Sequence, residues 1–190
     1  EVKLGDIGTA VQDITPELSE AFGLKNGQRG VLITQVGEHS PAAEAGITPG
    51  DIVTHINGVK TVSSARFRSL ISMTPIGDML RLSLLRHSET LEIDVRVIAR
   101  EDLSYSGKSL HPLLEGAQFG NNPQGGVVVT GLKPDSPAAF NGIRPDDIIV
   151  SANRVTVHDI ETLQRALSRD RSSVLLKIIR DNVSLFLVIR

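Results

Sequence analysis

Histidine, serine and acidic residues are the side chains of this sequence that could carry catalysis or hold a metal ion. No two of the histidines stand at a metal-ligand spacing such as His-x₃-His, and no Gly-x-Ser-x-Gly nucleophile motif occurs. We therefore expect structural or solvated roles for the histidines, no catalytic residue, and no metal or other cofactor. The histidines are His39, His55, His87, His111 and His158.

A glycine-rich stretch, GNNPQGG from Gly120 to Gly126, resembles a phosphate-binding loop only in composition. Such a loop is followed by Lys and then Ser or Thr, which are missing here. We expect an ordinary loop between two strands.

The composition limits the classes of partner. Hydrophobic residues make up 40% of the chain, and the formal net charge is −2 at pH 7. No basic excess exists to attract a phosphate backbone, so we expect no nucleic-acid partner. The chain has no cysteine, and its apolar runs are far shorter than the roughly 20 residues that span a bilayer. It opens on Glu1 rather than Met, from which we expect a piece of a longer protein.

A long motif occurs twice. The stretch SPAAEAGITPGDIVTHINGV begins at Ser40, and SPAAFNGIRPDDIIVSANRV begins 96 positions later at Ser136. Two copies at so long a period indicate a domain duplication rather than a solenoid. We predict one domain over residues 1–98 and a second over residues 112–190. The polar residues 99–111 show no sustained periodicity and predict a linker.

Each copy has the same order of predicted elements. In the first, Gly30–Val36 is rich in β-branched residues and predicts a buried strand. Ser40 and Pro41 stand where the N-cap and first residue of a short helix belong. A second helix is predicted to start at Ser63 or Ser64, and the alternating strands LRLSLLR and LEIDVRV follow. The prediction is a mixed α+β, β-rich fold, with two small, partly open antiparallel barrels or sandwiches that each carry two main helices.

These motifs resemble PDZ domains of the bacterial kind, in both copies and over nearly the whole chain. The shared signature is a hydrophobic strand, S-P-A-A-x-x-G-I, an acidic turn before a second strand, an Asn turn and a second helix. The upstream stretch VKLGDIGTAVQDITPELSEAFGL is similar to the segment that joins the protease and the first PDZ domain in the HtrA family of envelope serine endoproteases. The ending SLFLVIR resembles the last PDZ domain of such chains. The sequence thus resembles a tandem PDZ region of that family, without its protease domain.

The resemblance implies a peptide-binding groove in the first copy. PDZ modules bind an extended C-terminal peptide as an added strand, and a glycine-centred bend of backbone amides holds its terminal carboxylate. The carboxylate loop is expected at Ile7, Gly8 and Thr9, and the edge strand that the peptide joins at Ala10, Val11 and Gln12.

A competing placement of the carboxylate loop is Lys3-Leu4-Gly5-Asp6. It sets the carboxylate of Asp6 beside the incoming anion, and repulsion between like charges argues against it. Because Asp6 lies close to the loop in either placement, and because Thr9 is less apolar than the family's usual residue, we expect a modest affinity for carboxylates.

The opposite wall of the groove is expected on the second helix, residues 64–73. Phe67 and Leu70 are predicted to face the core, whereas Arg68, Ile71 and Ser72 would flank the peptide. For each of these helix residues, an ordinary place in the core or on a solvated face is the alternative.

The equivalent loop of the second copy is placed at Leu114, Glu115, Gly116 and Ala117, opposite a helix of residues 160–168. Glu115 would repel an anion, and Ala117 offers little wall, so we expect a weak or vestigial peptide site. In the family, PDZ surfaces help to assemble trimers into cages. The resemblance therefore implies subunit contacts for this copy.

By resemblance, the chain is the substrate-binding, regulatory and assembly region of a periplasmic HtrA-type serine endoprotease in protein quality control. The implied partners are unfolded or misfolded polypeptides and their C-termini, the protease domain of the same full-length protein, and further copies in a homo-oligomer. Two alternatives stay open. One is a pure oligomerisation module with both grooves idle, and the other is the PDZ pair of a site-2-type membrane metalloprotease.

Overall fold

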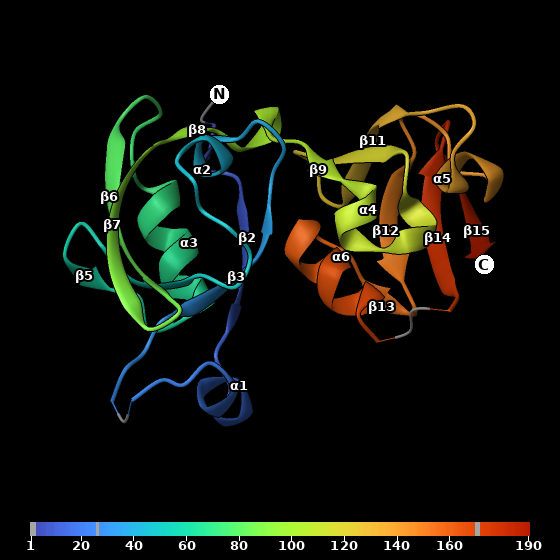
Figure 1. The fold of residues 1–190 in the computed structure, drawn as a ribbon. Coiled ribbons are helices and arrows are strands. Elements are labelled where there is room, and N and C mark those ends of the chain that lie inside the picture. The colour runs from blue at the N-terminus through green and yellow to red at the C-terminus, as the bar shows by residue number, and fades with distance from the viewer. Residues whose placement is uncertain (1–2, 26, 170–171) are drawn as a thin grey trace. The chain divides into compact units, whose positions relative to one another are not determined.

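Two compact units, Glu1–Arg100 and Glu101–Arg190, make up the chain, and each is described by itself. The structure is a computed structural model that describes residues 3–25, 27–169 and 172–190 (Figure 1). Each unit contains an antiparallel sheet that stays open rather than closing into a barrel, together with short helices. The predicted mixed α+β, β-rich class is confirmed.

The sheet of the first unit has the strand order β2-β3-β4-β6-β7, with β5 paired to β4. A separate two-stranded ladder joins β1 to β8. The helix α1 sits in the excursion between β2 and β3 and buries none of its residues. The elements are β1 (Gly5–Asp6), β2 (Thr9–Asp13), α1 (Pro16–Ala21), β3 (Val31–Val36), α2 (Pro41–Glu44), β4 (Ile52–Ile56), β5 (Val59–Lys60), α3 (Ser64–Ser72), β6 (Met79–Arg86), β7 (Glu89–Arg96) and β8 (Ile98–Ala99).

The sheet of the second unit has the order β15-β14-β12-β11-β10-β9, with β13 paired to β12. Single 3₁₀ turns lie at Arg100–Asp102 and Pro112–Leu114. The other elements are β9 (Tyr105–Ser106), α4 (Gly107–Leu110), β10 (Ala117–Asn121), β11 (Val127–Leu132), α5 (Pro137–Phe140), β12 (Ile148–Ala152), β13 (Val155–Thr156), α6 (Ile160–Leu167), β14 (Val174–Arg180) and β15 (Val183–Ile189).

The predicted starts of the two helices are confirmed, because Ser40 and Ser63 are the N-cap residues of α2 and α3. The Oγ of Ser40 accepts a hydrogen bond from the N–H of Ala43 at 3.1 Å, and Pro41 opens α2, where its missing N–H leaves no donor unsatisfied. Ser63 caps α3 in the same way, since its Oγ accepts from the N–H of Arg66 at 3.1 Å. Each helix therefore begins where a short polar side chain replaces the missing intrahelical acceptor.

The core of the first unit lies between its sheet and α3. It combines inward residues of the strands with the buried face of α3, on which Phe67 and Ile71 are each 2% exposed. Alternation along the strands and a spacing of four residues along the helix bring these side chains together. The principal members are Ile7, Val11, Val31, Ile33, Val53, Ile56, Phe67, Ile71, Leu80, Leu82, Leu84, Val95 and Val97.

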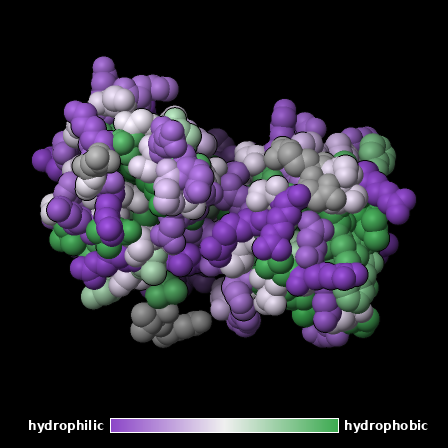
Figure 2. All heavy atoms as spheres, turned by 90° about the horizontal axis from the view of Figure 1, so that it is seen from below, coloured by the Kyte–Doolittle hydropathy of each residue, from purple (hydrophilic) through white to green (hydrophobic). Residues whose placement is uncertain are grey.

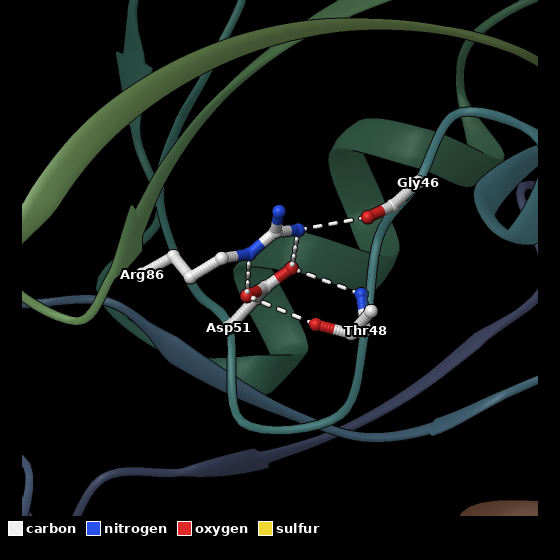
Figure 3. Close-up of polar contacts among 4 residues, drawn as sticks. All are labelled: Gly46, Thr48, Asp51 and Arg86. Carbon is white, nitrogen blue, oxygen red and sulfur yellow. Dashed lines mark hydrogen bonds and ion pairs between the residues drawn. The ribbon is translucent and has the colours of Figure 1, made fainter.

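A buried ion pair fixes the turn that precedes β4 (Figure 3). The carboxylate of Asp51, whose side chain is 2% exposed, accepts from Nε and Nη2 of Arg86 at 2.8 and 2.7 Å. It also accepts from the N–H of Thr48 at 2.9 Å, and Nη2 of Arg86 donates to the carbonyl of Gly46 at 2.8 Å. Burial raises the pKa of the Asp51 carboxyl, but the hydrogen bonds from Arg86 and Thr48 outweigh it, and the pKa falls below its usual value.

The second unit repeats this arrangement. Nε and Nη2 of Arg180 each donate to Asp147 at 2.8 Å, Nη2 also donates to the carbonyl of Gly142 at 2.8 Å, and the N–H of Arg144 donates to Asp147 at 2.9 Å. Two domains that share this buried contact as well as the S-P-A-A helix are products of one duplicated framework, as the sequence repeat predicts.

The predicted linker over residues 99–111 is wrong. Ala99 belongs to β8, which pairs with β1, so the first unit extends beyond residue 98. Tyr105 belongs to β9 and is 2% exposed, and Leu103 and Leu110 are also buried. The polar residues between these apolar ones face solvent or form turns. Because the two strands have only two residues each, they produce no periodic pattern in the sequence.

Replacing Asp51 with Asn should destabilise the first unit in a pH-dependent way. The folded pKa lies below the unfolded value of about 3.9, so the ion pair contributes stability above that pH and loses it as the pH falls through the folded pKa. We expect the variant to lose roughly 2–4 kcal/mol in unfolding free energy at pH 7, and the difference to shrink below about pH 4.

Urea unfolding followed by circular dichroism between pH 2 and 7 measures this difference. The matched control is Asp94→Asn, because Asp94 pairs with Arg81 at 3.0 Å on the exposed face of the same sheet and should change stability little. A difference for Asp51→Asn that stays constant over the whole range would contradict the role given to the charge.

Candidate functional site

The edge strand β2 and the helix α3 lie side by side at the place where the sequence predicts a peptide-binding groove. In the part of the chain that the structure describes, β2 pairs with β3 and no strand covers its other side. The helix α3 contacts both β1 and β2, and Figure 1 shows it beside β2. A sheet edge of this kind can accept a further strand through its backbone N–H and C=O groups.

Both ends of α3 are tied to the strands that it faces. At its start, Oδ1 of Asp13 in β2 accepts from the N–H of Ser64 at 2.7 Å. At its end, Gly5 of β1 lies so close that an added Cβ would stand 3.1 Å from the carbonyl oxygen of Thr74 and 2.5 Å from Cγ1 of Val97. A side chain at Gly5 would therefore push β1 away from the helix.

The glycine bend that was predicted to hold a carboxylate is already hydrogen-bonded to the chain. Oδ1 of Asp6 accepts from the N–H of Ile7 at 2.7 Å and from the N–H of Gly8 at 3.2 Å. The carbonyl oxygens of Ile7 and Gly8 accept from Ala42 and Gly37 at 2.9 and 2.7 Å. Gly8 has a φ of +94°, as an amide bend of this kind requires. The expected open amides are thus occupied by a carboxylate of the protein itself.

A cation lies near this carboxylate. Nε of Arg100 is 4.0 Å from Oδ2 of Asp6, and the N–H of Arg100 donates to the carbonyl of Leu4 at 2.9 Å. The bend and Arg100 together make a site where negative charge is favoured.

The residues expected along the groove are less exposed than the prediction implied. Thr9, Ala10 and Val11 are buried and Gln12 is half-buried. The hydroxyl oxygen of Thr9 is buried and has no hydrogen-bond partner in the described part of the chain.

On the helix wall, Arg68 and Ser72 are half-buried at the surface of α3. Ile71, which was expected to flank the peptide, is 2% exposed and lies in the core cluster beside Phe67, the alternative position considered for it. Leu70, predicted to face the core, packs against the same cluster while remaining partly exposed.

The loop assigned to the second unit is geometrically equivalent to the bend of the first. The carbonyl oxygens of Glu115 and Gly116 accept from Ala138 and Lys133 at 3.1 and 2.8 Å, and these donors stand 96 positions after Ala42 and Gly37. Gly116 has a φ of +98°, and an added Cβ would overlap Ser136. Leu114 and Ala117 are buried, whereas Glu115 is exposed and lies near Lys108, with Oε1 and Nζ 3.6 Å apart.

The groove edge differs between the two units. In the second, the edge of β10 is covered by β9, with Phe119 opposite Tyr105 and Gln118 opposite Ser106. The Oγ of Ser104 also donates to Oε1 of Gln118 at 3.0 Å. The chain's own segment thus takes the sheet position that a peptide would need.

Sequence reasoning missed the roles of Asp13, Tyr105 and the amide-capping Asp6. The side chain of an Asp can accept hydrogen bonds from the backbone N–H groups of the residues that follow it, so the sequence Asp6-Ile7-Gly8 carries a local signal for this contact. The contacts of Asp13 and Tyr105 join segments far apart in the chain, and no local pattern predicts them.

Other chemistries find no support in the described residues. Among them, no group of three or more His, Asp or Glu side chains could hold a metal ion. His111 is fully buried, and its Nδ1 accepts from the N–H of Leu113 at 3.1 Å, which caps the 3₁₀ turn that follows. No helix in the described ranges is long and apolar enough to cross a membrane.

Family models for the PDZ domain match residues 5–97 and residues 128–180. This chain is a tandem of PDZ domains. The periplasmic serine endoprotease DegP of Salmonella typhimurium is 32% identical over 191 residues, which cover 100% of this chain and 40% of the relative. The periplasmic pH-dependent serine endoprotease DegQ of Escherichia coli is 34% identical over 194 residues, which cover 100% of this chain and 42% of the relative.

The PDZ tandem thus spans about two fifths of the length of these relatives. Among solved structures, an HtrA-type protease AlgW with a decapeptide is 28% identical, with a TM-score of 0.48, over 52% of this chain and 30% of that one. The HtrA3 PDZ domain bound to a phage-derived ligand is 25% identical, with a TM-score of 0.43, over 49% of this chain and 84% of that one.

Replacing Asp13 with Ala should loosen α3 from β2. The variant leaves the N–H of Ser64 without its charged acceptor, and we expect a loss of about 1.5–3 kcal/mol in unfolding free energy. Hydrogen exchange of the amides of α3 measures the local effect, which should exceed that in β6 and β7. Glu17→Ala in the exposed helix α1 is the control, and equal exchange in both variants would show that Asp13 does not hold the helix.

Proposed function

We propose that the first PDZ domain binds the C-terminal segment of an unfolded polypeptide as an added strand on β2. The observation that carries this proposal is the edge of β2, which has no strand on its outer side in the described residues and faces α3. An extended peptide would pair its backbone with β2 and lay alternate side chains toward α3. Unfolded chains offer both an extended backbone and apolar side chains, which folded proteins bury.

The second PDZ domain is assigned a different task. Its equivalent edge is taken by β9, so a peptide would have to displace Tyr105 from a buried position. We propose that this domain does not bind peptides at β10 and acts instead in contacts with another copy of the chain.

An exposed apolar face supports the assembly role. Phe186 and Val188 lie on the same side of β15 and are 64% and 54% exposed. Figure 2 shows a hydrophobic area on the surface of the second unit. In the described part of the chain β15 pairs with β14 alone, and none of its residues is charged. A second copy of β15 could therefore pair with it in antiparallel fashion without bringing like charges together.

The relatives give the wider context of the proposal. They are named as periplasmic serine endoproteases, and we propose that this tandem serves such an enzyme in the periplasm. A protein held in the groove would raise the effective concentration of its cleavage sites at a protease domain in the same full-length chain. Because these relatives are named serine endoproteases, they favour the HtrA-type assignment over the PDZ pair of a site-2-type metalloprotease. The open edge of β2 argues against a module that acts only in assembly.

A backbone-modified peptide tests the strand-addition function. A synthetic ten-residue peptide with three apolar residues at its C-terminus should bind the 190-residue chain in calorimetry. The same peptide with alternate backbone nitrogens methylated cannot donate to the edge, and we expect at least a tenfold loss of affinity for one of the two methylation patterns. Equal affinity for all three peptides would refute strand addition at β2.

The assembly role predicts self-association through β15. Static light scattering should show a concentration-dependent increase in mass. Val188→Asp should abolish it, because Val188 lies opposite the apolar Leu175 and a charge placed there is left without a partner in the contact. The control is Val59→Asp, which changes an exposed valine of the first domain. A monomer at all concentrations for the unmodified chain would contradict this role.

A further inference from the structure

On the basis of the peptide-binding function proposed above, we propose that Asp6 is a built-in competitor of the bound peptide. Its carboxylate takes the amides that a terminal carboxylate would use, and it thereby sets how strongly the groove selects free C-termini.

The hydrogen bonds identify Asp6 as a mimic of a peptide terminus. One carboxylate oxygen accepts from two successive amides, Ile7 at 2.7 Å and Gly8 at 3.2 Å, across a glycine with positive φ. A bend of convergent N–H groups recognises any carboxylate that reaches it. The carboxylate of a ligand must therefore displace the carboxylate of Asp6. The binding free energy that it gains is the difference between the hydrogen bonds that it forms and those that Asp6 loses.

The surroundings favour an anion whichever carboxylate supplies it. Arg100 stands 4.0 Å from the other oxygen of Asp6 and would face a ligand carboxylate bound in its place. The hydroxyl of Thr9, the residue after the bend, is buried without a hydrogen-bond partner in the described residues. A buried hydroxyl of this kind costs free energy, and a ligand oxygen could satisfy it.

The second domain lacks this device. Glu115 corresponds to Ile7, because the carbonyl oxygens of both accept from the equivalent alanines Ala138 and Ala42. Leu114 therefore stands where Asp6 stands in the first domain, and it is fully buried. The competitor is thus found beside the open edge of β2 and is missing beside the covered edge of β10.

Removing the competitor should raise affinity for free C-termini selectively. The probe is the ten-residue peptide described above, made both with a free C-terminal carboxylate and with a C-terminal amide. For Asp6→Ala we expect the affinity for the free-acid form to rise about tenfold, because two amides become available to a charged acceptor. The affinity for the amidated form should stay within about twofold, because a neutral end gains little from the freed amides.

Two further variants make the result specific. Asp6→Asn keeps a side-chain oxygen on the bend but removes its charge, so the free acid should gain less than with Asp6→Ala. This variant also serves if the alanine variant unfolds. Glu89→Ala removes one negative charge from an exposed position at the β6–β7 turn and should leave both affinities unchanged.

The outcomes separate the inference from the function on which it rests. Binding of the unmodified chain without a gain in either Asp6 variant overturns the inference alone, as does an equal gain for acid and amide. No binding of either peptide to any variant overturns the proposed function, and the inference with it. A gain confined to the free acid supports both.

Discussion

The edge strand of a β-sheet presents one row of N–H and C=O groups that must be satisfied by another strand or by water. The two PDZ domains meet this requirement in different ways. In the first, no strand follows β2 among the described residues, and α3 stands beside the edge. In the second, the two-residue strand β9 covers β10. We propose that this difference at one edge determines which domain accepts a peptide and which serves other contacts.

The rest of the framework was kept through the duplication. Asp51 with Arg86 and Asp147 with Arg180 hold the same turn in the two domains, and each arginine also binds a carbonyl at the end of the short helix before it. Buried pairs of this kind are costly to break one partner at a time, since the other charge is left without compensation. The groove edge lies outside this contact, and it is the part in which the two domains differ.

Much of the fold could be predicted because its signals are local. A serine before Pro-Ala-Ala is enough to place α2, and Asn57-Gly58 supplies the positive φ values that a two-residue hairpin needs. The incorrect predictions concern contacts between segments that are far apart in the sequence. Tyr105 is buried because it pairs with Phe119, and nothing within a few residues of Tyr105 indicates that partner. Gly8 has the positive φ that an amide bend needs, but the sequence did not indicate that the carboxylate of Asp6 accepts hydrogen bonds from the amides of this bend.

The most direct test of the account is a backbone-amide chemical-shift titration of the isotopically labelled 190-residue chain with the ten-residue peptide. We predict that the amides whose chemical shifts change cluster in β1, β2 and α3, and that the chemical shifts of the amides in β9, β10 and α6 do not change. Chemical-shift changes centred on β10 and α6, or a loss of the pairing between β9 and β10 on addition of peptide, would contradict the claim that the peptide binds at the edge of β2 and not at the edge of β10.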